Sequence, residues 1–234
     1  MQKQRENIPG LSGNQLKIIA LIAMTCDHVG LQLLPQFGFL RIIGRLALPI
    51  YAYMIAEGCR YTRDRRRYLG RMLALAAVCL CEYFGAMGSL YQCILVTFSL
   101  SICLIFAVDR AVKSRKSGAV LLALVVFMAA CYVCVELPEK LFYTDFAVDY
   151  GIWGVLLPVF VYFGRSKRAK LAWLSVGLCL LAADLGGSQW WALAAVPLLA
   201  LYSGRRGTWR MGSLFYVYYP VHLAVIYGLS LLLR

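Results

Sequence analysis

Residues 18–34 read IIALIAMTCDHVGLQLL, an apolar stretch long enough to cross a membrane with an Asp-His pair inside it. A hydrocarbon layer of about 30 Å needs about 20 helical residues per crossing, so this stretch favours a transmembrane helix. An ionisable pair at bilayer depth costs several kcal/mol unless it is paired, hydrated or used. Asp27 and His28 are therefore the first candidates for a functional site.

The same apolar character extends over the whole chain of 234 residues, of which 62% are hydrophobic. The mean hydropathy is +0.71, and both values lie far above those of an ordinary soluble domain. We predict an all-α polytopic membrane protein, in which residues 1–15 form a cytoplasmic segment and residues 16–234 a single transmembrane domain. The nine predicted crossings are residues 16–34, 39–58, 71–88, 91–112, 118–137, 146–163, 169–185, 188–203 and 213–233.

The chain carries a net charge of +13, and its basic residues follow a pattern that indicates membrane topology. Basic residues gather in alternate connections, while the connections between these carry almost none. The positive-inside rule then predicts a cytoplasmic N-terminus and a C-terminus on the outer side of the membrane. Because the charges follow helix ends, we expect membrane lipids as neighbours and no nucleic-acid partner. The basic connections are residues 3–17, 60–71, 110–116, 165–170 and 205–210.

The two histidines of the chain, His28 and His222, both fall inside predicted crossings. A neutral imidazole is a suitable base near neutral pH, so either can be a catalytic group. Adjacent helical residues do not share a face, so we expect Asp27 to pair across a helix interface, with Arg45 or with His222. Arg41 and Arg45 lie four residues apart and share a face of the second crossing. An ion pair that only fixes helix packing is the alternative reading.

Further polar residues lie within or at the ends of crossings. Glu82, Thr97 and Asp149 fall in outer halves, whereas Glu57 ends the second crossing beside the basic segment 60–71. Arginine forks match phosphate oxygens, so this segment can bind phosphate, and it can equally serve only as a topology signal. The nine cysteines read as small apolar fillers, and we expect no metal site.

Several stretches together resemble the TraX family, named for the conjugal-transfer membrane protein that N-acetylates pilin. They are LKIIALIAMTCDHVG, RIIGRLALPIYAYMIAEGCRYTRDRRRYLGRML, DYGIWGVLLP and LFYVYYPVHL, in the order expected for the family. The motif residues are Asp27-His28, Gly44-Arg45, Glu57-Gly58, Thr62, Arg71, Asp149-Tyr150-Gly151 and Tyr219-Pro220-x-His222. The family is related to larger membrane acyltransferases.

The resemblance implies transfer of an acetyl group from cytoplasmic acetyl-CoA to an amine or hydroxyl acceptor, which can be a peptide, a glycan or a lipid. The expected catalytic residues are His28, Asp27, His222 and Arg45, with His28 favoured as the base and Arg45 as the oxyanion donor. The acetyl-CoA site is expected at Arg60, Arg63, Arg71, Thr62 and Glu57. The acceptor site is expected at Arg41, Glu82, Thr97, Asp149, Tyr150 and Tyr219.

A proton-coupled secondary transporter that uses Asp27, His28 and His222 is the competing function. Transporters of this kind are typically built from internal repeats with paired broken helices. The sequence shows no convincing internal repeat. We therefore expect an enzyme, and bound CoA should protect it against heat, whereas a transporter should be indifferent to CoA.

Overall fold

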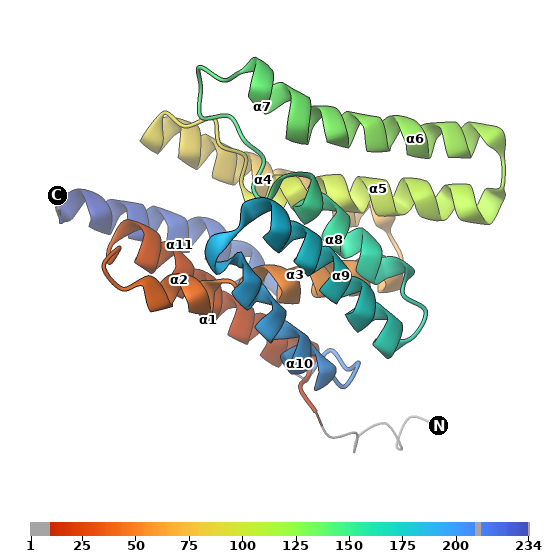
Figure 1. Ribbon diagram of the computed structural model, residues 1–234, viewed down its shortest axis with the longest axis horizontal. Helices are drawn as coiled ribbons and strands as arrows, with labels where there is room; N and C mark the ends of the chain where they lie inside the picture. Colours follow the sequence, from red (N-terminus) through yellow and green to blue (C-terminus); the bar gives the residue numbers. More distant parts are fainter. Residues whose placement is uncertain (1–9, 209–211, 234) are drawn as a thin grey trace. The chain divides into compact units, whose positions relative to one another are not determined.

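The computed structural model describes residues 10–208 and 212–233. Lys3, Arg5, Arg210 and most of the predicted N-terminal segment 1–15 lie outside these ranges. The described part consists of helices and the connections between them, with two isolated bridge pairs and no strand (Figure 1). The all-α prediction is therefore confirmed. Within the described ranges, four helical segments are long and apolar enough to cross a membrane: Gly38–Tyr61, Arg65–Met87, Ile94–Ser114 and Ser117–Lys140. Nine crossings and the orientation of the termini stay predictions.

The helices follow one another in the order and near the positions of the predicted crossings. They are α1 (Gly13–Gln32), α2 (Gly38–Gly44), α3 (Ala47–Tyr61), α4 (Arg65–Met87), α5 (Ile94–Ser114), α6 (Ser117–Cys131), the π-helix η2 (Tyr132–Glu136), α7 (Leu137–Lys140), α8 (Gly151–Phe163), α9 (Lys167–Leu185), the 3-10 helix η3 (Gly187–Ala194), α10 (Ala195–Ala200) and α11 (Gly212–Leu232).

The chain forms two compact units. The first joins residues 1–54 to 186–234, and the second consists of residues 55–185. That residues 16–234 act as a single domain stays a prediction.

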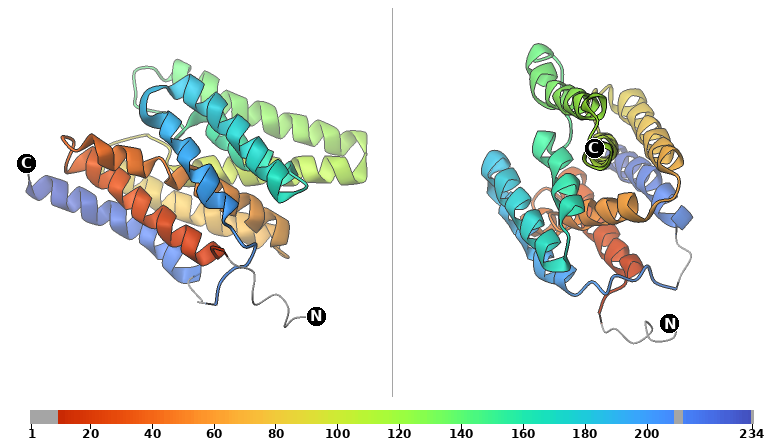
Figure 2. Two further views of the ribbon diagram at one scale, coloured as in Figure 1. Left: turned by 60° about the horizontal axis from the view of Figure 1, so that its bottom comes forward. Right: turned by 90° about the vertical axis from the view of Figure 1, so that its right-hand side faces the viewer.

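In the first unit, α1 begins at Gly13, three residues before the predicted start. The reason is a capping box: the Ser12 Oγ accepts a hydrogen bond from the Gln15 N–H, and the Gln15 Oε1 accepts one from the Ser12 N–H. Two otherwise unpaired backbone donors are thereby satisfied. Helix α1 packs against both α2 and α11 (Figure 2).

The predicted second crossing is interrupted between α2 and α3. The N–H groups of Arg45 and Leu46 bond to carbonyls three residues back, those of Ile42 and Ile43, in place of the α-helical pattern. Pro49 lies in the first turn of α3, where a missing N–H removes no helical hydrogen bond.

In the second unit, α5 and α6 form an antiparallel hairpin, and α5 also packs against α4 and α8. Helix α5 begins at Ile94 and α8 at Gly151, three and five residues after the starts of the predicted crossings 91–112 and 146–163. The backbone before each helix is used elsewhere: the Gln92 N–H donates to the Ala147 carbonyl at 2.8 Å, and the Asp149 N–H donates to the Gln92 carbonyl at 3.0 Å.

Candidate functional site

The two histidines meet in the first unit. His28, on α1, places its Nδ1 2.8 Å from the Nε2 of His222, on α11. The two rings stack with their centroids 5.0 Å apart. The contact joins residues 194 positions apart in the chain, and it exists because α1 and α11 are packing neighbours. Because α1 and α11 pack together, the two histidines can belong to one site.

The hydrogen-bond pattern fixes which nitrogens of the neutral histidine pair carry protons. The Nδ1 of His222 lies 3.0 Å from the main-chain carbonyl of Tyr218, which can only accept, so this nitrogen donates. The Nε2 of His222 is then the acceptor, and the Nδ1–H of His28 is its donor. This leaves the His28 Nε2 unprotonated, and no described residue bonds to it. Of the two histidines, His28 therefore presents the basic nitrogen.

Aromatic side chains of α11 enclose His222, which is only 6% exposed. The Tyr218 ring stacks on it at 5.2 Å between centroids, and the Tyr219 ring meets it edge-on at 5.3 Å. The Tyr218 hydroxyl is in turn 2.7 Å from the Thr25 hydroxyl on α1. Tyr219, predicted to bind the acceptor, is thus a buried neighbour of the histidine pair.

Asp27 binds both arginines of the predicted second crossing. Its Oδ2 lies 2.8 Å from the Arg41 Nη1, and its Oδ1 lies 2.6 Å from the Arg45 Nη2. The Arg45 side chain is 9% exposed and that of Arg41 is 33% exposed. The expected pairing of Asp27 with Arg45 is therefore present, and Arg41 joins it.

Gln189 completes this cluster and was missed by the sequence reasoning. Its Oε1 accepts a hydrogen bond of 3.0 Å from the Arg45 Nη1, and the residue is 3% exposed. Among the described residues its Nε2 has no partner. The turn before it contains Gly186 and Gly187 at φ 67° and 53°, where glycine avoids the strain of a side chain. The Gly-Gly pair at the start of an apolar stretch was the available signal.

The expected acetyl-CoA residues belong to the second unit, and several have structural partners. Glu57 forms an ion pair with Lys170 on α9, and both residues are below 10% exposed. The Arg60 Nη2 donates to the main-chain carbonyls of Tyr162 and Gly164 at the end of α8. The ion pair explains why the charged side chains of Glu57 and Lys170 can both lie buried.

The remaining residues of the basic segment differ in exposure. Arg63 and Arg71 are exposed, and neither has a side-chain partner among the described residues. Thr62 is partly buried, and its Oγ1 donates to the Asp64 carbonyl at 3.3 Å. Two arginines of the expected phosphate site are thus accessible.

The other expected acceptor residues lie near the connections of the second unit. Thr97 is fully buried and donates to the Asp149 carbonyl at 2.7 Å. The Asp149 Oδ1 accepts a bond of 2.7 Å from the Tyr91 hydroxyl. Tyr150 precedes α8 at φ 60°. One oxygen of Glu82, Oε2, is buried without a partner among the described residues.

The structure brings together one part of the expected site in the first unit. The other expected site residues belong to the second unit. The first unit brings together Asp27, His28, Arg41, Arg45, Tyr219 and His222. The cluster offers a free imidazole nitrogen next in sequence to a carboxylate that two guanidinium groups neutralise. Such a set can accept a proton and stabilise a developing negative charge.

The chain is similar to known proteins over most of its length. The family model described as "TraX protein" matches residues 12–230. A relative in Dichelobacter nodosus, named probable fimbrial assembly protein FimC of serogroup H1, is 28% identical over 95% of this chain and 97% of its own length. An uncharacterized protein of Rickettsia prowazekii (strain Madrid E) is 26% identical over 67% of this chain and 57% of its own length. No solved structure matches the chain.

Proposed function

The chain belongs to the TraX family of membrane proteins, a family tied to pilin assembly and acetylation, and from that premise we propose that it is an acetyltransferase of a bacterial inner membrane. The donor is cytoplasmic acetyl-CoA, and the acceptor is an amine or hydroxyl group of a peptide, a glycan or a lipid. The observation that supports this most is the His28–His222 pair, which leaves one imidazole nitrogen free to accept a proton.

His28 is the general base in this proposal. Its Nε2 takes the proton of the acceptor while the acceptor nitrogen or oxygen attacks the thioester carbonyl. The tetrahedral intermediate collapses with cleavage of the carbon–sulfur bond, and the CoA sulfur leaves with the proton as free thiol. His222 orients the base, because its Nε2 holds the Nδ1–H of His28.

Arg41 is better suited than Arg45 to donate to the oxyanion of that intermediate. Arg45 is buried and already bonded to Asp27, to Gln189 and to the Arg41 carbonyl. Arg41 is one-third exposed, and its hydrogen bonds to the described residues use only the Nη1. In this role Asp27 and Arg45 hold the guanidinium of Arg41, and that guanidinium stabilises the developing charge.

The phosphates of acetyl-CoA are assigned to Arg63 and Arg71. Both are exposed arginines in the basic segment, and a guanidinium pairs well with phosphate oxygens. Arg60 and Glu57 are left to structural roles by their contacts with the end of α8 and with Lys170.

The test is acetyl transfer by the purified chain in proteoliposomes, with radiolabelled acetyl-CoA and a panel of peptide, amino-sugar and lipid acceptors. His28→Ala should lower the rate by about 10²–10⁴-fold, while CoA still raises the unfolding temperature as it does for the unchanged protein. A His28→Ala variant that binds CoA and transfers the acetyl group at the original rate would overturn the assignment. A protein that CoA fails to protect would instead support the transporter alternative.

A further inference from the structure

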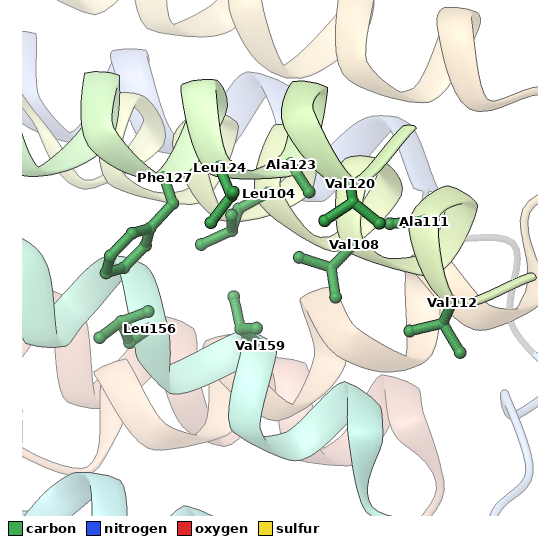
Figure 3. Close-up of a pocket in the computed structure, with 10 residues that line it drawn as sticks. All are labelled: Leu104, Val108, Ala111, Val112, Val120, Ala123, Leu124, Phe127, Leu156 and Val159. Carbon is green, nitrogen blue, oxygen red and sulfur yellow. The ribbon is translucent and has the colours of Figure 1, made fainter. Parts of the chain in front are cut away.

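An apolar groove runs along the second unit between α5, α6 and α8. Its volume is about 470 Å³, within the range of about 300–1,000 Å³ typical of ligand sites. Figure 3 shows Val108, Phe127, Leu156 and Val159 directed toward one shared space, and all ten lining residues are apolar. Helix α6 and its continuation to Lys140 form one of the four apolar segments that can cross a membrane. An apolar groove beside a segment that can cross a membrane fits a hydrocarbon chain.

One end of the groove adjoins a basic turn. Val112 and Val120 line the groove on either side of the α5–α6 connection. Arg115 and Lys116 form that connection, and Arg110 lies in the last turns of α5. All three basic side chains are exposed, and none has a side-chain partner among the described residues.

The acidic group nearest in sequence does not neutralise this turn. Asp109 is occupied by the Arg65 Nη2 at 2.5 Å, by the Lys113 Nζ at 2.9 Å and by the Tyr162 hydroxyl at 3.1 Å. Its side chain is only 10% exposed. The turn therefore presents net positive charge where the groove ends.

Arg115 is also held in an unfavourable backbone conformation. It has φ 53° and ψ 17°, a left-handed geometry that glycine or asparagine adopts more readily. A long basic side chain at such a position is a feature that a turn by itself does not require.

From these observations we infer that the second unit has a binding site for an anionic glycerophospholipid. One acyl chain lies in the groove, and the headgroup phosphate is bound by Arg115, Lys116 and Arg110. Apolar burial and charge-assisted bonds to the phosphate supply affinity for any glycerophospholipid. The preference comes from the positive charge of the turn, which favours a headgroup with a net negative charge over a zwitterionic one. The inference is independent of the proposed acetyl transfer.

The test is native mass spectrometry of the full chain, released from nanodiscs that contain equal amounts of phosphatidylglycerol and phosphatidylcholine. The expected result is one retained phosphatidylglycerol per chain, favoured over phosphatidylcholine. Arg115→Asn/Lys116→Gln should lower the retention of phosphatidylglycerol by about tenfold or more, since each lost charge-assisted bond is worth more than a factor of ten, and should bring the retention of the two lipids closer together. Asparagine is chosen because it tolerates the left-handed conformation. Arg66→Gln/Arg67→Gln removes the same charge elsewhere in the unit and should leave the preference unchanged.

A second pair of variants tests the groove itself. Ala123→Phe fills the space with a ring, whereas Ala129→Phe places the same ring on an exposed part of α6 outside the groove. Only the first should abolish lipid retention, with helix content by circular dichroism unchanged in both. Equal retention of the two lipids by the unchanged protein would overturn the inference. So would an equal loss of preference in Arg66→Gln/Arg67→Gln, or retention that survives Ala123→Phe.

Discussion

Gly44 lies against Asp27 so closely that a Cβ atom on residue 44 would come within 2.3 Å of the Asp27 Oδ1. The absence of a side chain at this position allows α2 to approach α1 and lets the next residue, Arg45, bond to the same carboxylate. The Gly44-Arg45 motif thus has a packing reason as well as a chemical one.

Gly44→Ala should destabilise the protein by about 1–3 kcal/mol, because the methyl group overpacks the interface and displaces Asp27. Gly38→Ala is the matched control in the same helix, since an added Cβ there meets nothing within 4 Å. The measurement is the unfolding temperature in detergent together with the rate of acetyl transfer. Equal stability of the two variants would show that the contact is not a constraint.

His222→Phe should keep the aromatic packing of the site and remove the nitrogen that orients His28. We expect the rate of acetyl transfer to fall by about 10²-fold or more, as when a histidine base loses its orienting partner. The pH dependence of the rate should change as well, because the base is no longer coupled to a second imidazole. Tyr218→Phe keeps the main-chain carbonyl that holds His222 and should remain close to the original rate. A rate that falls more in Tyr218→Phe than in His222→Phe would contradict the proposed proton arrangement.

Glu57 and Lys170 should behave as a coupled structural pair. Glu57→Gln or Lys170→Met alone leaves one buried charge without its partner, which costs about 3–5 kcal/mol. The double variant removes both charges and should be more stable than either single variant. Unfolding titrations in mixed micelles measure this cycle. The affinity of the folded double variant for acetyl-CoA should be unchanged. A large loss of that affinity would show that Glu57 belongs to the acetyl-CoA site.

Arg63→Gln/Arg71→Gln should weaken acetyl-CoA binding by about 1.5–3 kcal/mol for each bond lost. Arg66→Gln/Arg67→Gln removes the same charge from the same segment and should have a smaller effect. Arg60→Gln should lower the unfolding temperature instead, because its guanidinium bonds to two carbonyls at the end of α8. Equilibrium dialysis with labelled CoA gives the affinities. Unchanged affinity in the first variant would leave the segment as a topology signal only.

Asp145 should make the connections of the second unit sensitive to acid. The Ser89 hydroxyl and the Leu90 N–H donate to its carboxylate, and the Ser89 bond is the larger cause of a pKa below the usual range. A lowered folded-state pKa contributes stability above the unfolded value of about 3.9, and this stability is lost as the pH falls through the folded pKa. Asp145→Asn should therefore lower the unfolding temperature at pH 7, and the difference should begin to shrink near about pH 4 and be lost as the pH falls through the folded pKa. A difference that stays constant down to pH 3 would exclude this role.

Several features of the protein could be predicted from the sequence because they depend on short segments. An apolar stretch of about 20 residues specifies a helix wherever its neighbours lie. The helices therefore appear in the predicted order, and Asp27 and His28 stand out as ionisable residues within an apolar stretch. The starts of α5 and α8 could not be predicted in this way, since pairing between Gln92 and residues 147–149 uses their backbone groups.

The partners of the polar residues were decided only by the tertiary structure. His28 and His222 are 194 positions apart, Arg45 and Gln189 are 144 apart, and Glu57 and Lys170 are 113 apart. Periodicity shows which face of a helix is polar and says nothing about which helix packs against that face. The sequence by itself thus determined a helical membrane protein with ionisable groups inside its apolar stretches. Only the packing of α1 against α11 and α2 decided which imidazole nitrogen is left free, because that depends on contacts between distant segments.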